Sequence, residues 1–182
     1  HTGKTGPMSG PRIILFDLET VPNLPEALKV WTSLSNYPGQ TLKASISSII
    51  CVGWKVLGSK KVECINAWDF PDWEKNVNED GPLCRAIYDI LKDADCVVTH
   101  NGKRFDWKFL QTRLMFHGMD PLPKIHPVDT CAEAKKNLMV FNNRLNTLSR
   151  FLTDTEKMDH EGWDLWVKVH GRDPKAMMTM TK

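Results

Sequence analysis

The chain has 182 residues, of which 41% are hydrophobic and 25% charged, with a formal net charge of +2. This balance is typical of one globular domain with a sizeable core and excludes a disordered or collagen-like chain. No apolar run approaches the roughly 18–20 residues that a membrane span needs. The near-neutral charge provides no global basic field, so nucleic-acid binding would depend on a local patch.

The two ends and the cysteines bear on domain organisation and location. Residues 1–7 resemble the remnant of an expression tag, and Met8 is the expected natural start. We therefore expect a single domain over residues 8–182. The five cysteines are scattered without a C-x-x-C pair, and their odd number and the lack of a secretory signal indicate a reducing, cytoplasmic setting.

Hydrophobic patterning predicts strands in the first part of the chain. An apolar strand over 12–17 precedes breaker residues and a short helix over 26–34. Strand-rich segments over 46–57 and 61–68 are separated by a Gly-Ser-Lys turn typical of a hairpin. The acidic segment 69–80 is predicted to be a loop.

The rest of the chain alternates helices with short strands. The expected elements are a helix from Gly81, a strand over 96–99, a helix over 103–117, a strand over 125–128, and helices over 132–138, 144–152 and from Asp173. Three strands joined by hairpins and then strands alternating with helices predict an α/β protein. Its mixed five-stranded sheet would have three antiparallel strands, then parallel βαβ units, and helices flanking it.

Two carboxylates lie two positions apart where the first strand ends. Asp17 and Glu19 should project side by side, because residues i and i+2 of a strand share a face, whereas Leu18 faces the apolar side. Such like charges repel unless a cation lies between them, and oxygen ligands favour Mg²⁺ or Mn²⁺ over zinc. Asp106 begins a helix after another strand, so the three carboxylates form a candidate divalent-metal site.

These segments resemble the motifs of the DEDD superfamily of 3′–5′ exonucleases. The first motif, an apolar strand ending in D-x-E-T, is matched by Asp17, Glu19 and Thr20. The second, H-N-x-x-x-F-D-x-x-F-L, is matched by His100, Asn101, Phe105, Asp106, Phe109 and Leu110. Both motifs occur in the expected order and on the expected elements. The resemblance implies a ribonuclease H-like fold and two-metal-ion hydrolysis, by Mg²⁺ or Mn²⁺, at 3′ ends of single-stranded or frayed DNA.

The resemblance also implies individual roles. Asp17, Glu19 and Asp106 are the expected catalytic residues and metal ligands. The residues expected to contact the substrate lie beside them: Leu18, Thr20, Asn101, Lys103, Arg104 and Phe105.

Simpler readings compete for some of these positions. Asparagine is common at strand-to-helix turns, which would explain Asn101, and Lys103 and Arg104 also fit a solvated first helical turn. Asp129 is expected to cap the following helix rather than to bind metal. His100 is expected to be structural rather than a general base.

The family's chemistry takes a fourth carboxylate on a late helix, near a tyrosine or histidine that orients the water. The late candidates, none of which fits in spacing and position, are Asp154, Asp159, His160, Asp164, His170 and Asp173. We therefore expect the domain to be C-terminally incomplete, with its third motif beyond Lys182 and with weak metal binding as a result.

Two alternatives remain from the residues. One is an RNA-directed or endonucleolytic enzyme of the same fold. The other is a catalytically silent domain that binds nucleic acid. Single-stranded DNA or a 3′ end is the expected partner, with RNA as the alternative and with no membrane. The sequence does not distinguish a stand-alone enzyme from one that works beside a polymerase or helicase.

Overall fold

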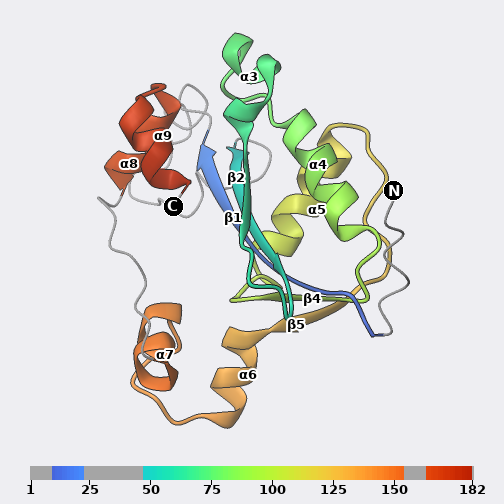
Figure 1. The fold of residues 1–182 in the computed structure, drawn as a ribbon, viewed down its shortest axis with the longest axis vertical. Helices are drawn as coiled ribbons and strands as arrows, with labels where there is room; N and C mark the ends of the chain where they lie inside the picture. The colour runs from blue at the N-terminus through green and yellow to red at the C-terminus, as the bar shows by residue number, and fades with distance from the viewer. Residues whose placement is uncertain (1–9, 23–46, 154–162, 182) are drawn as a thin grey trace, which may run out of the picture.

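The computed structural model describes residues 10–22, 47–153 and 163–181. They form a mixed five-stranded sheet in the order β3-β2-β1-β4-β5, with helices on both faces (Figure 1). The helix expected over 26–34 lies outside the described residues.

The sheet combines an antiparallel half with a parallel half. β1 (Ile13–Pro22) pairs antiparallel with β2 (Ser47–Val56), which pairs antiparallel with β3 (Glu63–Asn66). β4 (Cys96–Thr99) runs parallel to β1, and β5 (His126–Asp129) runs parallel to β4. The predicted fold class is confirmed, and β1 continues well past the expected end of the first strand.

The main core lies between one face of the sheet and two helices, α4 (Gly81–Leu91) and α5 (Asp106–Phe116). The β1 residues Ile14, Phe16 and Leu18 point into this core. Because side chains alternate along a strand, Asp17 and Glu19 face the opposite side of the sheet. The predicted direction of the two carboxylates therefore agrees with the packing.

Two short helices lie on that opposite side (Figure 1). α8 (Trp163–His170) and α9 (Pro174–Met180) pack against the sheet through a smaller apolar cluster, which includes Val21 and Ile50. α8 was not predicted, because only Leu165 and Val169, four residues apart, provide its buried contacts. A pattern of two residues is too short to distinguish a helix from a loop.

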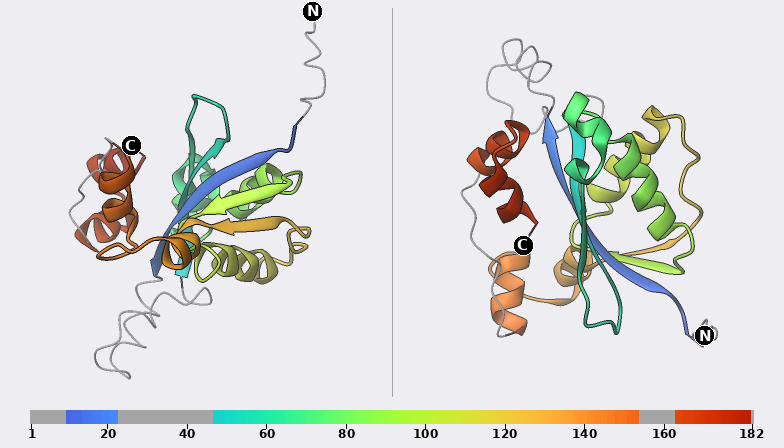
Figure 2. Two further views of the ribbon diagram at one scale, coloured as in Figure 1. Left: turned by 90° about the horizontal axis from the view of Figure 1, so that it is seen from below. Right: turned by 45° about the horizontal axis from the view of Figure 1, so that its top comes forward.

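A pair of helices forms a lobe beside the sheet. α6 (Thr130–Asn137) follows β5 directly, and α7 (Leu145–Leu152) lies next to it (Figures 1 and 2). We call residues 130–152 the α6–α7 lobe.

The segment 69–80, predicted to be a loop, contains α3 (Pro71–Lys75) after a single 3-10 turn, η1 (Ala67–Asp69). Pro71 suits the first position of a helix, and Trp73 anchors the turn with only 3% of its surface exposed. Among the described residues, no helix is both long enough and apolar enough to cross a bilayer.

Candidate active site

The unequal lengths of β1 and β4 create the site. β4 pairs with β1 only from Ile13 to Leu15, whereas β1 runs on to Pro22. Beyond this pairing, the Leu18 N–H donates a hydrogen bond to Asp106 Oδ1, at 3.2 Å, instead of to a strand. The part of β1 beyond β4 therefore brings Asp17 and the Leu18 backbone close to Asp106.

Asp106 lies at the first position of α5 with 4% of its surface exposed. Burial, followed by the negative charge of Asp17, raises the pKa of Asp106 to about 6, although the hydrogen bond from Leu18 opposes the shift. Asp17 itself is exposed and Glu19 is half-buried. The structure thus places a buried carboxylate beside an exposed one, with their charges in conflict.

The charge of Asp17 reaches Asp106, and Glu19 lies on the same face of β1 as Asp17. In the described ranges, one set of three His, Cys, Asp or Glu ligand atoms lies within 4.8 Å of one another, and it consists of Asp80, Cys84 and His117. Asp17, Glu19 and Asp106 form a more open arrangement than that.

The turn between β4 and α5 has an unusual backbone conformation. Asn101 has a φ of 68°, in the left-handed region where asparagine is enriched. A Cβ on Gly102 would overlap the Thr99 side chain. Asp129 accepts the backbone N–H groups of Asn101 at 2.8 Å and Lys103 at 3.2 Å. These contacts fix the turn that leads to Asp106.

A Gly102→Ala substitution should therefore disturb the turn that leads to Asp106. Overlap with Thr99 should cost about 1–3 kcal/mol, the usual range for overpacking. Urea unfolding measures this loss, with Gly53→Ala as the control, because a Cβ there meets nothing within 4 Å. Equal stability of the two variants would contradict the close approach at Gly102.

Asp129 is an N-cap, as predicted. Its Oδ1 also accepts the N–H groups of Cys131, at 3.0 Å, and Ala132, at 3.2 Å, at the start of α6. Burial raises the pKa of Asp129, but the four backbone N–H groups outweigh burial and hold it below its usual value. The carboxylate joins the turn before α5 to the first turn of α6.

His100 is held within the protein on both sides of its ring. Nδ1 lies 2.9 Å from Thr130 Oγ1, and Nε2 lies 2.9 Å from the carbonyl oxygen of Asn143. A carbonyl only accepts, so Nε2 carries a proton. These bonds join the end of β4 to the α6–α7 lobe and support the structural reading of His100.

Five of the six residues expected to contact the substrate fall into two groups. Asn101, Lys103 and Arg104 are exposed on the turn before α5. The side chains of Leu18 and Thr20 are buried, so they would present backbone atoms to a ligand.

Phe105 belongs to neither group. It is half-buried and packs against Phe109 with ring centroids 5.5 Å apart. Its ring therefore already has a structural partner within the second motif.

An apolar pocket of about 440 Å³ opens beside Asp17. It lies on the face of the sheet opposite α4 and α5. The residues that line it come from β1, β2, the following turn, β4 and the lobe: Leu15, Phe16, Asp17, Gly53, Trp54, Lys55, Val62, Val98, Thr99, His100, Thr130 and Leu145. It is large enough to receive part of a nucleotide.

Of the late candidates for a fourth carboxylate, Asp154, Asp159 and His160 lie outside the described residues. Asp173 caps α9 by accepting the Ala176 N–H at 2.8 Å. Asp164 is exposed on α8.

A second cluster of charged side chains was not predicted. Asp80 accepts hydrogen bonds from the Ile49 N–H at 2.7 Å, from Arg113 Nε at 2.9 Å and from His117 Nε2 at 2.6 Å. Burial raises the pKa of Asp80, but the hydrogen bonds from His117 and Arg113, the charge of Arg113 and the Ile49 N–H together outweigh burial and keep the pKa below its usual value. No sequence signal marks this cluster, since Asp80 and Arg113 are 33 residues apart.

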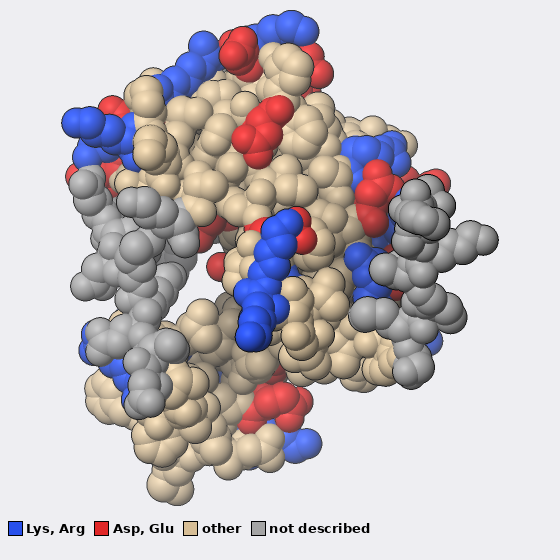
Figure 3. All heavy atoms as spheres, in the orientation of Figure 1, with Lys and Arg blue, Asp and Glu red and all other residues tan. Residues whose placement is uncertain are grey.

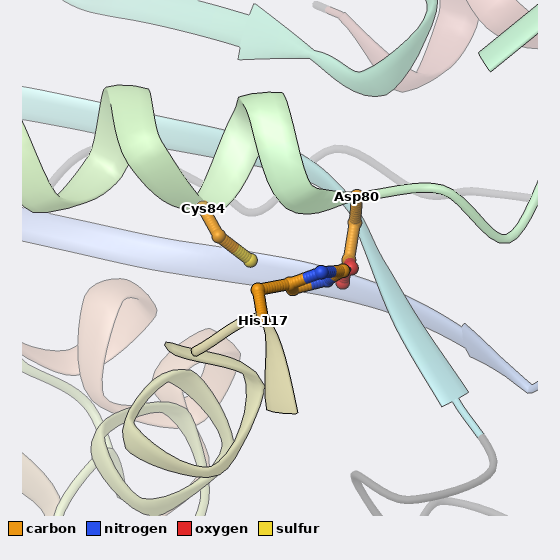
Figure 4. A group of neighbouring side chains, drawn as sticks. All are labelled: Asp80, Cys84 and His117. Carbon is orange, nitrogen blue, oxygen red and sulfur yellow. The ribbon is translucent and has the colours of Figure 1, made fainter. Parts of the chain in front are cut away.

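An ion pair dominates this cluster, in which Asp80, Cys84 and His117 also form a group of metal-ligand type (Figure 4). Arg113 is buried against Asp80 and supplies the compensating positive charge. Burial also raises the pKa of the Cys84 thiol, whereas a metal ligand must be a thiolate. Asp80 and His117 are thus already hydrogen-bonded to each other.

Comparison with known proteins identifies the family. The sheet order and the flanking helices are those of an α/β domain of ribonuclease H type. A family model described as the RNase_H superfamily matches residues 40–167, well over half of the sequence. The chain belongs to the RNase_H superfamily.

A solved structure with the same fold is the family B DNA polymerase from the hyperthermophilic archaeon Pyrobaculum calidifontis, with a TM-score of 0.60 and 17% sequence identity. The match covers 94% of this chain and 22% of the polymerase chain. At this identity, the likeness establishes a shared fold. None of the curated proteins matches the chain.

Proposed function

We propose that this domain is a metal-dependent 3′–5′ exonuclease that hydrolyses phosphodiester bonds at the 3′ ends of single-stranded or frayed DNA. The observation that carries the proposal is the contact of Asp106 with the backbone of Leu18, between Asp17 and Glu19. Asp17 lies close enough to Asp106 for its charge to raise the pKa of that carboxyl, and Glu19 lies on the same face of β1 as Asp17. Membership of the RNase_H superfamily and the fold shared with a DNA polymerase support a nucleic-acid substrate.

The donor set suits a hard divalent cation. Asp17, Glu19 and Asp106 offer oxygen atoms alone, which favours Mg²⁺ or Mn²⁺. The raised pKa of Asp106, which results from burial and from Asp17, is the response expected where carboxylates share a site. When bound, such ions would neutralise these charges and provide Lewis-acid activation of the phosphodiester and the attacking water.

The chain's own residues would position the DNA. Asn101, Lys103 and Arg104 are exposed on the turn beside Asp106, where cations and an amide can contact phosphate and sugar. The pocket beside Asp17 would receive the terminal nucleotide, with Leu18 and Thr20 contributing backbone atoms. Phe105 would lie beside the substrate, with its ring held in place by packing against Phe109.

The test is the digestion of a linear single-stranded oligonucleotide in Mn²⁺. With a label on the terminal nucleotide, the protein should release labelled mononucleotide first. Asp17→Asn should abolish this release, and so should removal of the metal with EDTA. Release that survived Asp17→Asn would contradict the proposal.

Two further substrates separate the alternatives. A circular single strand has no end and should stay intact, so its cleavage would indicate an endonuclease. An RNA of the same sequence should be digested more slowly than the DNA, and the reverse order would indicate an RNA-directed enzyme. Tight oligonucleotide binding without any metal-dependent cleavage would support a silent binding domain.

A further inference from the structure

The α6–α7 lobe exposes an unusual number of large apolar side chains. The exposed residues are Leu138, Met139, Phe141, Leu145, Phe151 and Leu152. Phe141 and Met139, in the connection between the helices, are 97% and 104% exposed. Single exposed apolar residues are normal, but a group of them marks an interaction surface.

The apolar surface of the lobe is continuous with the candidate active site. A groove of about 510 Å³ runs between α6 and α7 and is lined by Leu138, Leu145 and Leu148 among others. It shares His100, Thr130 and Leu145 with the pocket beside Asp17. Figure 3 shows that the face of the lobe turned to the viewer is mostly uncharged.

The charge on the lobe is positive. Its basic residues are Lys135, Lys136, Arg144 and Arg150, whereas Glu133 is its one acidic residue. The whole chain, in contrast, has 24 basic and 22 acidic residues. The lobe therefore has a local excess of positive charge, which nucleic-acid binding by a nearly neutral protein would require.

We propose that the α6–α7 lobe binds the single-stranded DNA immediately upstream of the 3′ end, with bases against Phe141 and Met139 and phosphates beside the basic residues. Single-strand binding combines aromatic platforms for bases with positive charge along the backbone, and the lobe offers both. The inference rests on the proposed function, because the continuous groove joins the lobe to the site where the 3′ end would lie. A protein partner is the competing occupant.

The first test measures binding without cleavage. Fluorescence anisotropy of a labelled 12-nucleotide single strand is recorded in EDTA. Phe141→Ala should weaken binding by about 5- to 100-fold, the range for loss of one aromatic stacking platform. Met139→Ala should weaken it less. The matched controls are Phe116→Ala and Met115→Ala on α5, where these residues are 63% and 70% exposed, and they should bind like the unsubstituted protein.

Charge provides a second readout. Replacing Lys135 and Lys136 with glutamine should reduce the slope of log K against log salt by about 1.4, since each phosphate contact to a single strand contributes about 0.7. Unchanged affinity in Phe141→Ala together with an unchanged slope would overturn the inference and leave the lobe to a protein partner.

Cleavage distinguishes failure of this inference from failure of the proposed function. In Mn²⁺, Phe141→Ala should lower kcat/KM on the 12-nucleotide strand and leave kcat/KM on a dinucleotide unchanged, because a dinucleotide in the pocket beside Asp17 should not extend to Phe141, which does not line that pocket. If the unsubstituted protein cuts both substrates and Phe141→Ala matches it on both, the inference fails and the exonuclease stands. If the unsubstituted protein cuts neither substrate, the exonuclease proposal fails, and the anisotropy result alone decides whether the lobe binds DNA.

Discussion

An Asp106→Asn variant is expected to lose metal-dependent digestion by about a thousandfold or more and yet to be more stable than the unsubstituted protein above pH 6. The loss corresponds to the several kcal/mol of charge stabilisation that metal ligands support. The gain in stability follows from the pKa of Asp106, which burial and then Asp17 raise to about 6.

The sign of the pH dependence follows from linkage. An aspartate in the unfolded chain has a pKa near 3.9, so the folded protein holds the Asp106 proton more tightly than the unfolded chain does. This contribution to stability is complete below about pH 4 and is lost as the pH rises through about 6. Asparagine keeps an oxygen for the Leu18 N–H and carries no charge. Without metal, the variant should gain roughly 1–3 kcal/mol at pH 8, and the difference should vanish near pH 4.

Thermal unfolding in EDTA at pH 8 and pH 4 measures both limits. Each kcal/mol should shift the midpoint by roughly 2–4 °C for a chain of this size. Adding Mn²⁺ should raise the midpoint of the unsubstituted protein and leave Asp106→Asn nearly unchanged. A variant less stable than the unsubstituted protein at pH 8 would contradict the charge conflict between Asp106 and Asp17.

Asp106 also shows which features of the candidate site could be predicted from the sequence and which could not. The apolar run before Asp17 and the i, i+2 spacing of Asp17 and Glu19 are local signals, and both the strand and its buried face were predictable from them. The contact of Asp106 with Leu18 depends on where β4 stops relative to β1, which is a property of strand register. No pattern within either segment encodes that register, so the motif indicated the residue but not its contact.

The α6–α7 lobe was partly predictable from the sequence. Its helices were expected from periodicity, and every basic residue in it can be read from the sequence. The exposure of Phe141 and Met139 was not predictable, because the same residues in a connection often turn back into a core. Burial is settled by tertiary packing, which the sequence pattern alone does not specify.

An Asp80→Asn variant is expected to lose about 3–5 kcal/mol of unfolding free energy at pH 7, the largest stability change predicted for this chain. Asp80 is 1% exposed, and its loss would leave the buried Arg113 without a counter-charge. It also holds the Ile49 N–H, and Ile49 pairs with Thr20, next to the register shift that follows Glu19. The cluster therefore secures the part of β2 that pairs with β1 next to Glu19.

The pH dependence of this effect has the opposite sign to that of Asp106. Burial raises the pKa of Asp80, but the hydrogen bonds from His117, Arg113 and the Ile49 N–H, with the charge of Arg113, lower it more, so the folded pKa lies below the unfolded value. The contribution of Asp80 is complete above about pH 4 and is lost as the pH falls below that value. Urea unfolding at pH 7 and at pH 3 should show the difference between the two proteins shrinking in acid.

Asp89→Asn on the same helix is the matched control. Asp89 pairs with Lys92 at 2.7 Å, but both side chains are about half exposed, so its loss should cost far less than the loss of Asp80. Similar losses in Asp80→Asn and Asp89→Asn would rule out a special role for the buried cluster. A large loss in Asp80→Asn with activity retained at low temperature would show that the cluster stabilises the catalytic strand without taking part in the reaction.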